Sequence, residues 1–256
     1  MYNYNDNRVL IDVLEEVQMN RLKIAIGGMA LLLMFVASTT NPIQAKEDPF
    51  NKASFSNSLV IDNPYLPLVP GTTYIYQGTA DRRSTYEEFV VTNQTKTILG
   101  VETRVIHDTN WENGKVIEDT FDWFAQDDEG NVWYFGEFST EYKNGKVIGH
   151  HGSWEAGVNG ASAGIVMEAK PKVGDTYQQE LAPGIAEDMV TVLSLNEIVC
   201  VPFGCFSNVL KTKDFTPLEP GVAENKYYAP GIGQIKTIAV EGGSEVSELV
   251  DIVTNE

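Results

Sequence analysis

The sequence predicts an all-β protein: a curled antiparallel sheet closed as a barrel or half-barrel, with a β-sandwich as the second choice. Short runs of β-branched and aromatic residues alternate with turn residues from Thr72 to the C-terminus. After residue 45, no stretch keeps a helical period over three turns. Asn113-Gly114 and Asn144-Gly145 each separate two such runs, and Asn-Gly is the strongest short signal for a hairpin.

Ten or more strands are expected, joined mainly as sequential hairpins. A short helix near residues 183–187 is the one helical element that the pattern allows. The expected strands cover residues 73–78, 86–91, 103–110, 116–125, 132–142, 147–154, 176–181, 189–195, 209–212, 226–229, 235–240 and 247–253.

Residues 1–45 have the pattern of a secretory signal peptide. Arg21 and Lys23 form a basic flank, an apolar run covers residues 24–37, and Ala45 precedes the expected cleavage. The run is about 14 residues, short of the roughly 20 that cross a bilayer, and this length favours a cleaved signal peptide. An uncleaved signal anchor is the alternative. Met19 offers a second start that would leave residues 1–18 untranslated. We expect a lead-in segment over 46–71 and a single β-rich domain over 72–256.

The chain has 18 basic and 36 acidic residues and a net charge of −18. This balance argues against a nucleic-acid partner, because phosphates require a basic surface. It favours solubility and leaves cationic partners open. No dinucleotide, P-loop or zinc motif is present, and we expect no cofactor and no membrane span after signal cleavage.

The two cysteines, Cys200 and Cys205, flank a Pro-Phe-Gly turn signal between two strand-like runs. A tight hairpin brings such ends within disulfide reach, and an exported protein meets an oxidising compartment. We therefore predict a Cys200–Cys205 disulfide and a secreted or periplasmic location.

Turn geometry predicts which side chains face one another in the two Asn-Gly hairpins, because side chains alternate strictly along a strand. Glu118 and Asp122 are expected on the face of His107, and Glu137 and Glu141 on the face of His150. The expected pairs are His107–Thr120, Asp108–Asp119, Ile106–Phe121 and Arg104–Trp123 in the first hairpin, and Ser139–His150 and Phe138–His151 in the second.

The connection at residues 127–131 determines whether these two polar faces join. A two-residue Glu129-Gly130 turn would place four carboxylates side by side, bordered by both histidines. A turn with a bulge at Gly130 would separate the two sets, and we favour it because glutamate disfavours positive φ. The divalent-cation candidates are His107, Glu118, Asp122 and His150. The Asp127-x-Glu129-x-Asn131 string itself is interpreted as an acidic hairpin turn, since it lacks the calcium-loop glutamate.

Carboxylates could also support catalysis, since opposed acidic groups have separated pKa values. The candidates for a secreted hydrolase are Asp108, Glu118, Asp119, Asp122 and Glu137. The string Gly160–Gly164 matches G-x-S-x-G, but all three histidines precede Ser162, so we interpret it as a flexible loop.

All four tryptophans fall within the two hairpins and their flanks. Most such residues form core, although an aromatic surface or lined cavity would suit a ligand. The ligand-binding candidates are Trp111, Trp123, Trp133, Trp154 and Tyr134.

Five sequence segments are considered together: DNPYLPLVPGT (62–72), NVWYFGE (131–137), GSWEAG (152–157), VPFGCFSNVL (201–210) and YYAPGIG (227–233). Together they resemble a group of exported prokaryotic β-rich proteins, over most of residues 62–250. The last phrase also resembles the closing strands of periplasmic lipocalin-like and lipoprotein-carrier-like half-barrels. The resemblance implies an exported barrel-like fold and assigns no catalytic residue.

The sequence as a whole favours an exported, non-enzymatic protein that binds a small or apolar ligand or a partner. The alternatives are the carboxylate-dependent hydrolase and a divalent-cation-binding β-domain.

Overall fold

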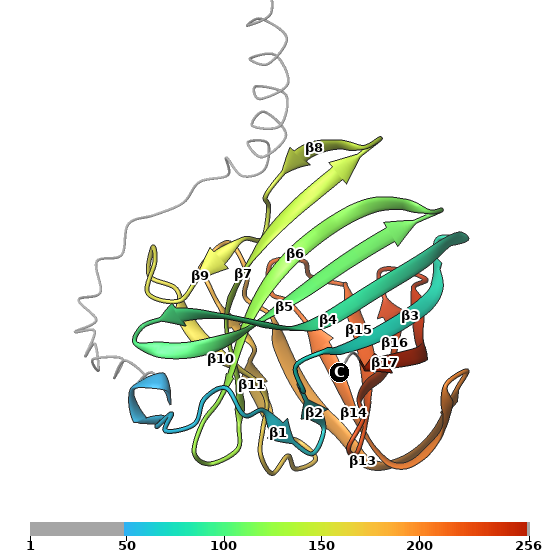
Figure 1. Cartoon of the computed structure of the whole chain (residues 1–256). Helices are drawn as coiled ribbons and strands as arrows, with labels where there is room; N and C mark the ends of the chain where they lie inside the picture. Colours follow the sequence, from blue (N-terminus) through green and yellow to red (C-terminus); the bar gives the residue numbers. More distant parts are fainter. Residues whose placement is uncertain (1–48, 255–256) are drawn as a thin grey trace, which may run out of the picture. The chain divides into compact units, whose positions relative to one another are not determined.

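The computed structural model describes residues 49–254, which lie in the compact unit Lys46–Glu256. Within this range there is no α-helix, and one antiparallel sheet of 15 strands curls into a nearly closed barrel (Figure 1). The predicted all-β class is therefore confirmed, and the barrel is the correct choice over the sandwich. The predicted signal peptide lies outside the described residues.

Neighbouring strands in the barrel are mostly neighbours in sequence. The order around the wall is β11-β13-β14-β15-β16-β17-β3-β4-β5-β6-β7-β10-β12, with β8 and β9 also on β7. The bounds are β3 Thr72–Ala80, β4 Arg83–Ile98, β5 Val101–Glu112, β6 Lys115–Gln126, β7 Val132–Lys143, β8 Lys146–Gly149, β9 Trp154–Glu155, β10 Ser162–Met167, β11 Thr176–Gln178, β12 Glu180–Leu181, β13 Met189–Val201, β14 Gly204–Phe215, β15 Ala223–Ala229, β16 Gly233–Glu241 and β17 Val246–Thr254.

The barrel is completed by one short segment rather than by a continuous strand pair. β11 pairs with β13, and β12, which follows directly in sequence, pairs with β10. Residues 176–181 therefore cross the seam between the two ends of the sheet. Gln179 lies at the crossing, where its amide donates to Val166 O and its backbone N–H to Asp188 O.

The segment before β3 closes one end of the barrel. It contains the 3₁₀ helix η1 (Pro49–Lys52) and the short strands β1 (Asp62–Asn63) and β2 (Leu66–Pro67). Its Leu68 side chain is fully buried, and its Phe50 and Phe55 rings pack against Trp133 and Phe135. At the mouth of the barrel, the turns 81–82, 113–114 and 242–245 lie together, since Asp81 N donates to Ser244 Oγ and Ser84 N donates to Asn113 Oδ1. Of these turns, only 242–245 lines the mouth cavity.

Both Asn-Gly turns have the backbone that the sequence predicts. Asn113 and Gly114 have φ values of 48° and 74°, and Asn144 and Gly145 have 54° and 72°. Positive φ at two consecutive residues is the requirement of a type I′ turn. The β5–β6 and β7–β8 hairpins are therefore confirmed.

The register of the first hairpin changes three residues from its turn. Trp111 pairs with Val116, but Asn110 pairs with Glu118, so Ile117 is an extra residue on β6. A one-residue shift exchanges the two faces of a strand relative to its neighbour. The observed pairs are His107–Phe121, Asp108–Thr120, Ile106–Asp122 and Arg104–Phe124, so the predicted partners of these four residues are wrong.

The 127–131 connection has the bulged form that we favoured, but its predicted consequence is wrong. Gly130 has a φ of 94°, and the strands leave the turn in the shifted register. A second bulge then follows at Gly136, whose φ is 123°. It restores the original register, so that Glu118 pairs with Glu141 and Asp122 with Glu137.

Three further sequence expectations are corrected. β8 ends at Gly149, so Ser139–His150 and Phe138–His151 are not ladder pairs; β7 pairs instead with β9. The small-residue string expected as a flexible loop has most of its length in β10, where Gly164 pairs with Tyr134. Residues 183–185 form a turn closed by the Ala182–Ala186 bridge rather than a helix.

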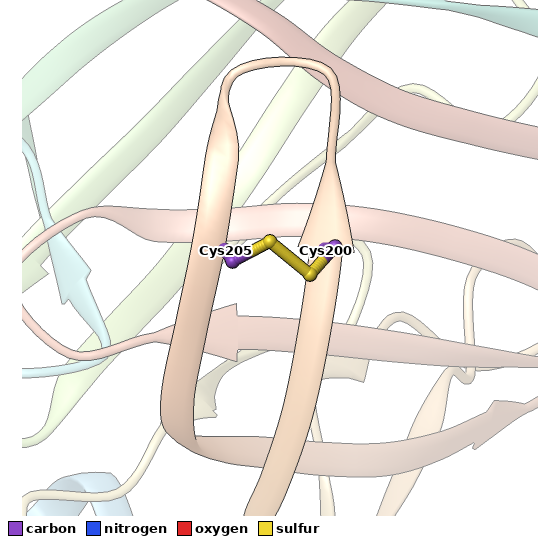
Figure 2. The surroundings of a disulfide bond; sticks show 2 residues. All are labelled: Cys200 and Cys205. Atoms are coloured by element: carbon purple, nitrogen blue, oxygen red, sulfur yellow. A yellow bond between two sulfur atoms is a disulfide. The ribbon is translucent and has the colours of Figure 1, made fainter.

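The predicted disulfide is present: Cys200 and Cys205 pair across the β13–β14 hairpin, with Cα atoms 4.0 Å apart (Figure 2). It links residues only five apart, so it restricts a short loop of the unfolded chain.

We expect the double substitution Cys200→Ser and Cys205→Ser to lower the free energy of unfolding by about 2 kcal/mol, the loop-entropy value for so short a loop. Urea unfolding of both proteins measures the difference. Because the bridge lies at a hairpin tip, the circular dichroism of the folded barrel is expected to stay unchanged. Loss of the folded state would contradict this local role.

Candidate functional site

The barrel encloses a cavity of about 330 Å³ whose wall is rich in carboxylates. Side chains from strands on every side of the barrel reach it, because alternate residues of each strand point inward. The mouth contains a second cavity of about 560 Å³, and Glu180, Asp188, Glu224 and Glu245 line both. The acidic residues that line the two cavities are Glu87, Asp108, Asp122, Glu137, Glu180, Asp214 and Glu224, together with the exposed Asp188, Glu219, Glu241 and Glu245.

Only one basic side chain among the described residues lines either cavity, that of Lys226. Its Nζ lies 3.2 Å from Glu224 Oε1 and 3.4 Å from Asp214 Oδ2. Burial alone would lower the pKa of Lys226, but Glu224 and Asp214 raise it well above its ordinary value. Lys226 is therefore a charged ammonium that neutralises part of one side of the interior.

A tyrosine hydroxyl joins two interior carboxyls on the other side. Tyr134 Oη donates to Asp122 Oδ1 at 2.5 Å and lies 2.9 Å from Glu137 Oε2. Burial raises the pKa of Tyr134 well above its ordinary value, with further increases from both carboxylates, so its hydroxyl keeps its proton. A hydroxyl has one proton to donate, so one of the two carboxyls must carry a proton of its own to complete both hydrogen bonds.

Both carboxyls of this pair have raised pKa values. Burial, followed by the charges of Asp122 and Glu180, raises the pKa of Glu137 to about 9. Burial raises the pKa of Asp122 to about 7, although the hydrogen bond from Tyr134 opposes this. The Asp122–Glu137 pair therefore shares a proton at neutral pH, and the larger increase favours Glu137 as the group that holds it.

The same physical cause acts on the rest of the interior. Burial raises the pKa of Glu87 to about 7 and that of Glu180 to about 7, and it raises the pKa of Asp108 well above its ordinary value. Neighbouring carboxylates add to the increase at each of these groups, while the charge of Lys226 opposes it at Glu87 and Glu180. The interior therefore holds protons at neutral pH, and its carboxylates outnumber its one ammonium.

Several polar side chains that line the cavity have oxygens without a hydrogen-bond partner in the described part of the chain. The Tyr228 side chain is 4% exposed and lines the cavity, and its hydroxyl has no partner among residues 49–254. Asp122 is 7% exposed, and its Oδ2 likewise has none. The Glu87 carboxylate lines the same cavity and forms no ion pair with a described residue. These oxygens are open to the cavity and are available to bond a polar ligand.

Aromatic rings form much of the remaining cavity wall. Tyr74, Tyr76, Phe89 and Phe124 line it, and Phe124 stacks on Tyr134 with ring centroids 4.7 Å apart. Ring faces attract cations and also pack against methylene groups. In this cavity, the charge of an organic cation would therefore contact carboxylates and ring faces, and its hydrocarbon part would pack against the rings.

The structure separates the four predicted metal-binding residues. His107 lies on the outer wall, 2.6 Å from Asp119, whereas Glu118 and Asp122 are on the inner face with Asp108. His150 contacts Ser139 O and stacks on Phe138, whose side chain is exposed. Within residues 49–254, no group of three or more His, Cys, Asp or Glu side chains is arranged to hold a metal.

Of the predicted ligand-binding aromatics, only Tyr134 lines the central cavity. Trp133 is buried and donates to Asp127 Oδ2, while Trp123 lies under the Lys96 ammonium, 3.3 Å from Nζ to the ring centroid. Trp154 is buried and donates to Glu180 Oε1 at 3.3 Å, so it positions a cavity carboxylate. Trp111 packs edge-on against Tyr86.

The acidic turn at 127–131 is structural, as predicted. Asp127 Oδ1 accepts from the backbone N–H groups of Glu129 and Asn131, and Oδ2 accepts from the side chains of Asn131 and Trp133. Both oxygens of the Asp127 carboxylate therefore accept hydrogen bonds from within the hairpin.

The fold and cavity define an all-β barrel with an acidic, ligand-sized interior. The sequence matches no protein-family model and no curated protein at a significant level. Among solved structures, it is similar to the crystal structure of a putative lipoprotein from Parabacteroides distasonis, with 11% identity and a TM-score of 0.41 over 75% of this chain and 99% of that one. In the described residues, no helix has both the length and the apolarity to cross a bilayer.

Proposed function

We propose that this chain is an exported, non-enzymatic binding protein whose barrel interior holds a small organic cation. The observation that carries the proposal is the central cavity itself: seven carboxylates line it, against the single ammonium of Lys226. A guest with positive charge compensates this excess and satisfies the unpaired oxygens, whereas an apolar guest would do neither.

The proposed compartment is the periplasm or the cell exterior. The signal-like segment at residues 1–45 and the Cys200–Cys205 disulfide both support it, since disulfides persist in oxidising environments. The volume of the cavity is in the range of small-molecule sites, which supports a metabolite-sized ligand.

Thermal unfolding of the purified protein at pH 8 tests the proposal. We expect n-butylamine or 1,4-diaminobutane to raise Tm by several degrees at millimolar concentration, because a ligand that binds only the folded state stabilises it by mass action. Sodium butyrate and 1-butanol, of similar size without positive charge, are the controls. Asp122→Asn should reduce the shift, and equal shifts in both proteins or with butyrate would contradict an acidic interior site.

A second candidate is a secreted hydrolase that uses Asp122 and Glu137. It is favoured by the tyrosine-linked pair, since carboxyls with separated pKa values can serve as base and acid. Turnover of a chromogenic glycoside or ester, reduced at least about 100-fold by Asp122→Asn, would support it. Absence of turnover across such a panel leaves the binding function.

A further inference from the structure

The chain itself shows how the interior accommodates an alkylammonium. Lys226 is a primary ammonium on a methylene stem, and it lies between Glu224 and Asp214 at 3.2 and 3.4 Å. Asp214 also accepts from Thr212 Oγ1 at 2.5 Å, which fixes its carboxylate. This ion pair defines one ammonium position on the β14–β15 side of the cavity.

The β4–β7 side has carboxylates of the same kind without such a cation. Glu87, Asp108 and Asp122 line the cavity there, and no Lys, Arg or His of residues 49–254 forms an ion pair with any of them. Asp122 Oδ2 and the buried Tyr228 hydroxyl have no hydrogen-bond partner in the same range. This side therefore offers acceptors for a second ammonium, one that must come from a ligand.

A third group of carboxylates lies at the rim shared by the two cavities. Glu180, Asp188 and Glu245 line both the central cavity and the mouth. In the described part of the chain, no basic side chain lines the mouth cavity. The charge of Lys226 acts on all three rim carboxylates, but this one ammonium is already paired with Glu224 and Asp214, so the rim keeps a net negative charge. A ligand with two or more charges can place one at Asp122 and another at the rim.

We propose that the ligand is a linear aliphatic diamine or longer polyamine, with one terminal ammonium at Asp122 and another at the rim formed by Glu180, Asp188 and Glu245. The inference rests on the proposed function, and it specifies the chemical class of the ligand. The methylene chain would pack against the aromatic wall that includes Tyr74, Tyr76 and Phe124.

The geometry disfavours the other common sources of positive charge. A divalent metal ion requires several convergent oxygen ligands, and the described residues contain no such group. A monoamine supplies one charge, which can lie at Asp122 or at the rim but not at both. A diamine can place one ammonium at each.

Isothermal titration of the protein with n-butylamine, 1,4-diaminobutane and spermidine, at pH 8 and about 0.15 M salt, tests the inference. We expect 1,4-diaminobutane or spermidine to bind at least about 30-fold more tightly than n-butylamine. Glu180→Gln should weaken the diamine about 10-fold or more while changing n-butylamine less, whereas Asp122→Asn should weaken both amines. Both replacements are isosteric, and each keeps an acceptor oxygen for Tyr134 or Trp154.

Glu102→Gln, at an exposed position outside both cavities, is the matched control and should leave every affinity unchanged. Near-UV circular dichroism of each variant verifies the fold. If n-butylamine binds within threefold of the diamine, the polyamine inference is overturned while the cation-binding function stands. If none of the three amines binds, both are overturned.

Discussion

Ligand-free protein is expected to be less stable at pH 9 than at pH 5 by at least about 5 kcal/mol. Burial raises the pKa values of Glu87, Asp122 and Glu180 to about 7 and that of Glu137 to about 9. In the unfolded chain the same carboxyls titrate near 4. Above this pH the folded state retains protons that the unfolded state has lost, so the stability falls as the pH rises and levels off once the folded-state carboxyls ionise, at about pH 7 for three of them and about pH 9 for Glu137.

Urea unfolding at pH 5, 7 and 9 measures this dependence. Asp122→Asn removes one of the buried charges and should reduce the difference between pH 5 and pH 9 by about 1–3 kcal/mol. The exposed Glu102→Gln variant should retain it. Stability that rises from pH 5 to pH 9 would show that the interior carboxylates are not desolvated as described.

The second large effect concerns the seam of the barrel. Gly164→Ala is expected to lower the free energy of unfolding by about 3 kcal/mol, because overpacking against backbone cannot be relieved by a rotamer change. A Cβ atom at Gly164 would lie 2.2 Å from the Gln179 carbonyl oxygen, which belongs to the segment that crosses the seam. The substitution should therefore displace residues 176–181 from β10.

Gly160→Ala is the matched control within the same string. Gly160 has a φ of 84°, but no atom lies within 4 Å of the position that an added Cβ would occupy, so only backbone strain of about 1 kcal/mol is expected. Urea unfolding gives the energies, and amide hydrogen exchange at Gln179 and Glu180 reports the seam. Equal costs for the two variants would contradict the packing argument.

Local turn chemistry made most of the fold predictable. Asn-Gly dipeptides specify type I′ turns, and the strands on either side of them occur where the alternation predicts them. The disulfide followed from the spacing of Cys200 and Cys205 and the turn between them. These features depend on residues close in sequence, so the sequence alone was sufficient.

The faces of the strands were not predictable in the same way. The bulge at Ile117 moves Asp108, Glu118 and Asp122 to one face, and the bulge at Gly136 places Asp122 beside Glu137. Bulges depend on the packing of the whole barrel and have a weak local signature. Four of the five predicted hydrolase carboxylates consequently share the inner face, while Asp119 pairs with His107 on the outer wall.

Half of the site was missed because it lies on distant strands. Glu180, Asp188, Asp214, Glu245 and the Glu224–Lys226 pair meet the β4–β7 carboxylates only when the sheet closes. One local signal was present: Glu224, Lys226 and Tyr228 alternate along β15, so charged residues share the face of a buried aromatic. Charge at inward-facing positions of a predicted barrel strand indicates a polar interior.

A crystal structure of the protein with 1,4-diaminobutane at pH 8 tests the central claim most directly. We predict an ammonium nitrogen within about 3 Å of Asp122 Oδ2, inside the barrel, with the methylene chain against the aromatic wall. A diamine bound only on the outer surface, or an empty interior at saturating concentration, would contradict the account.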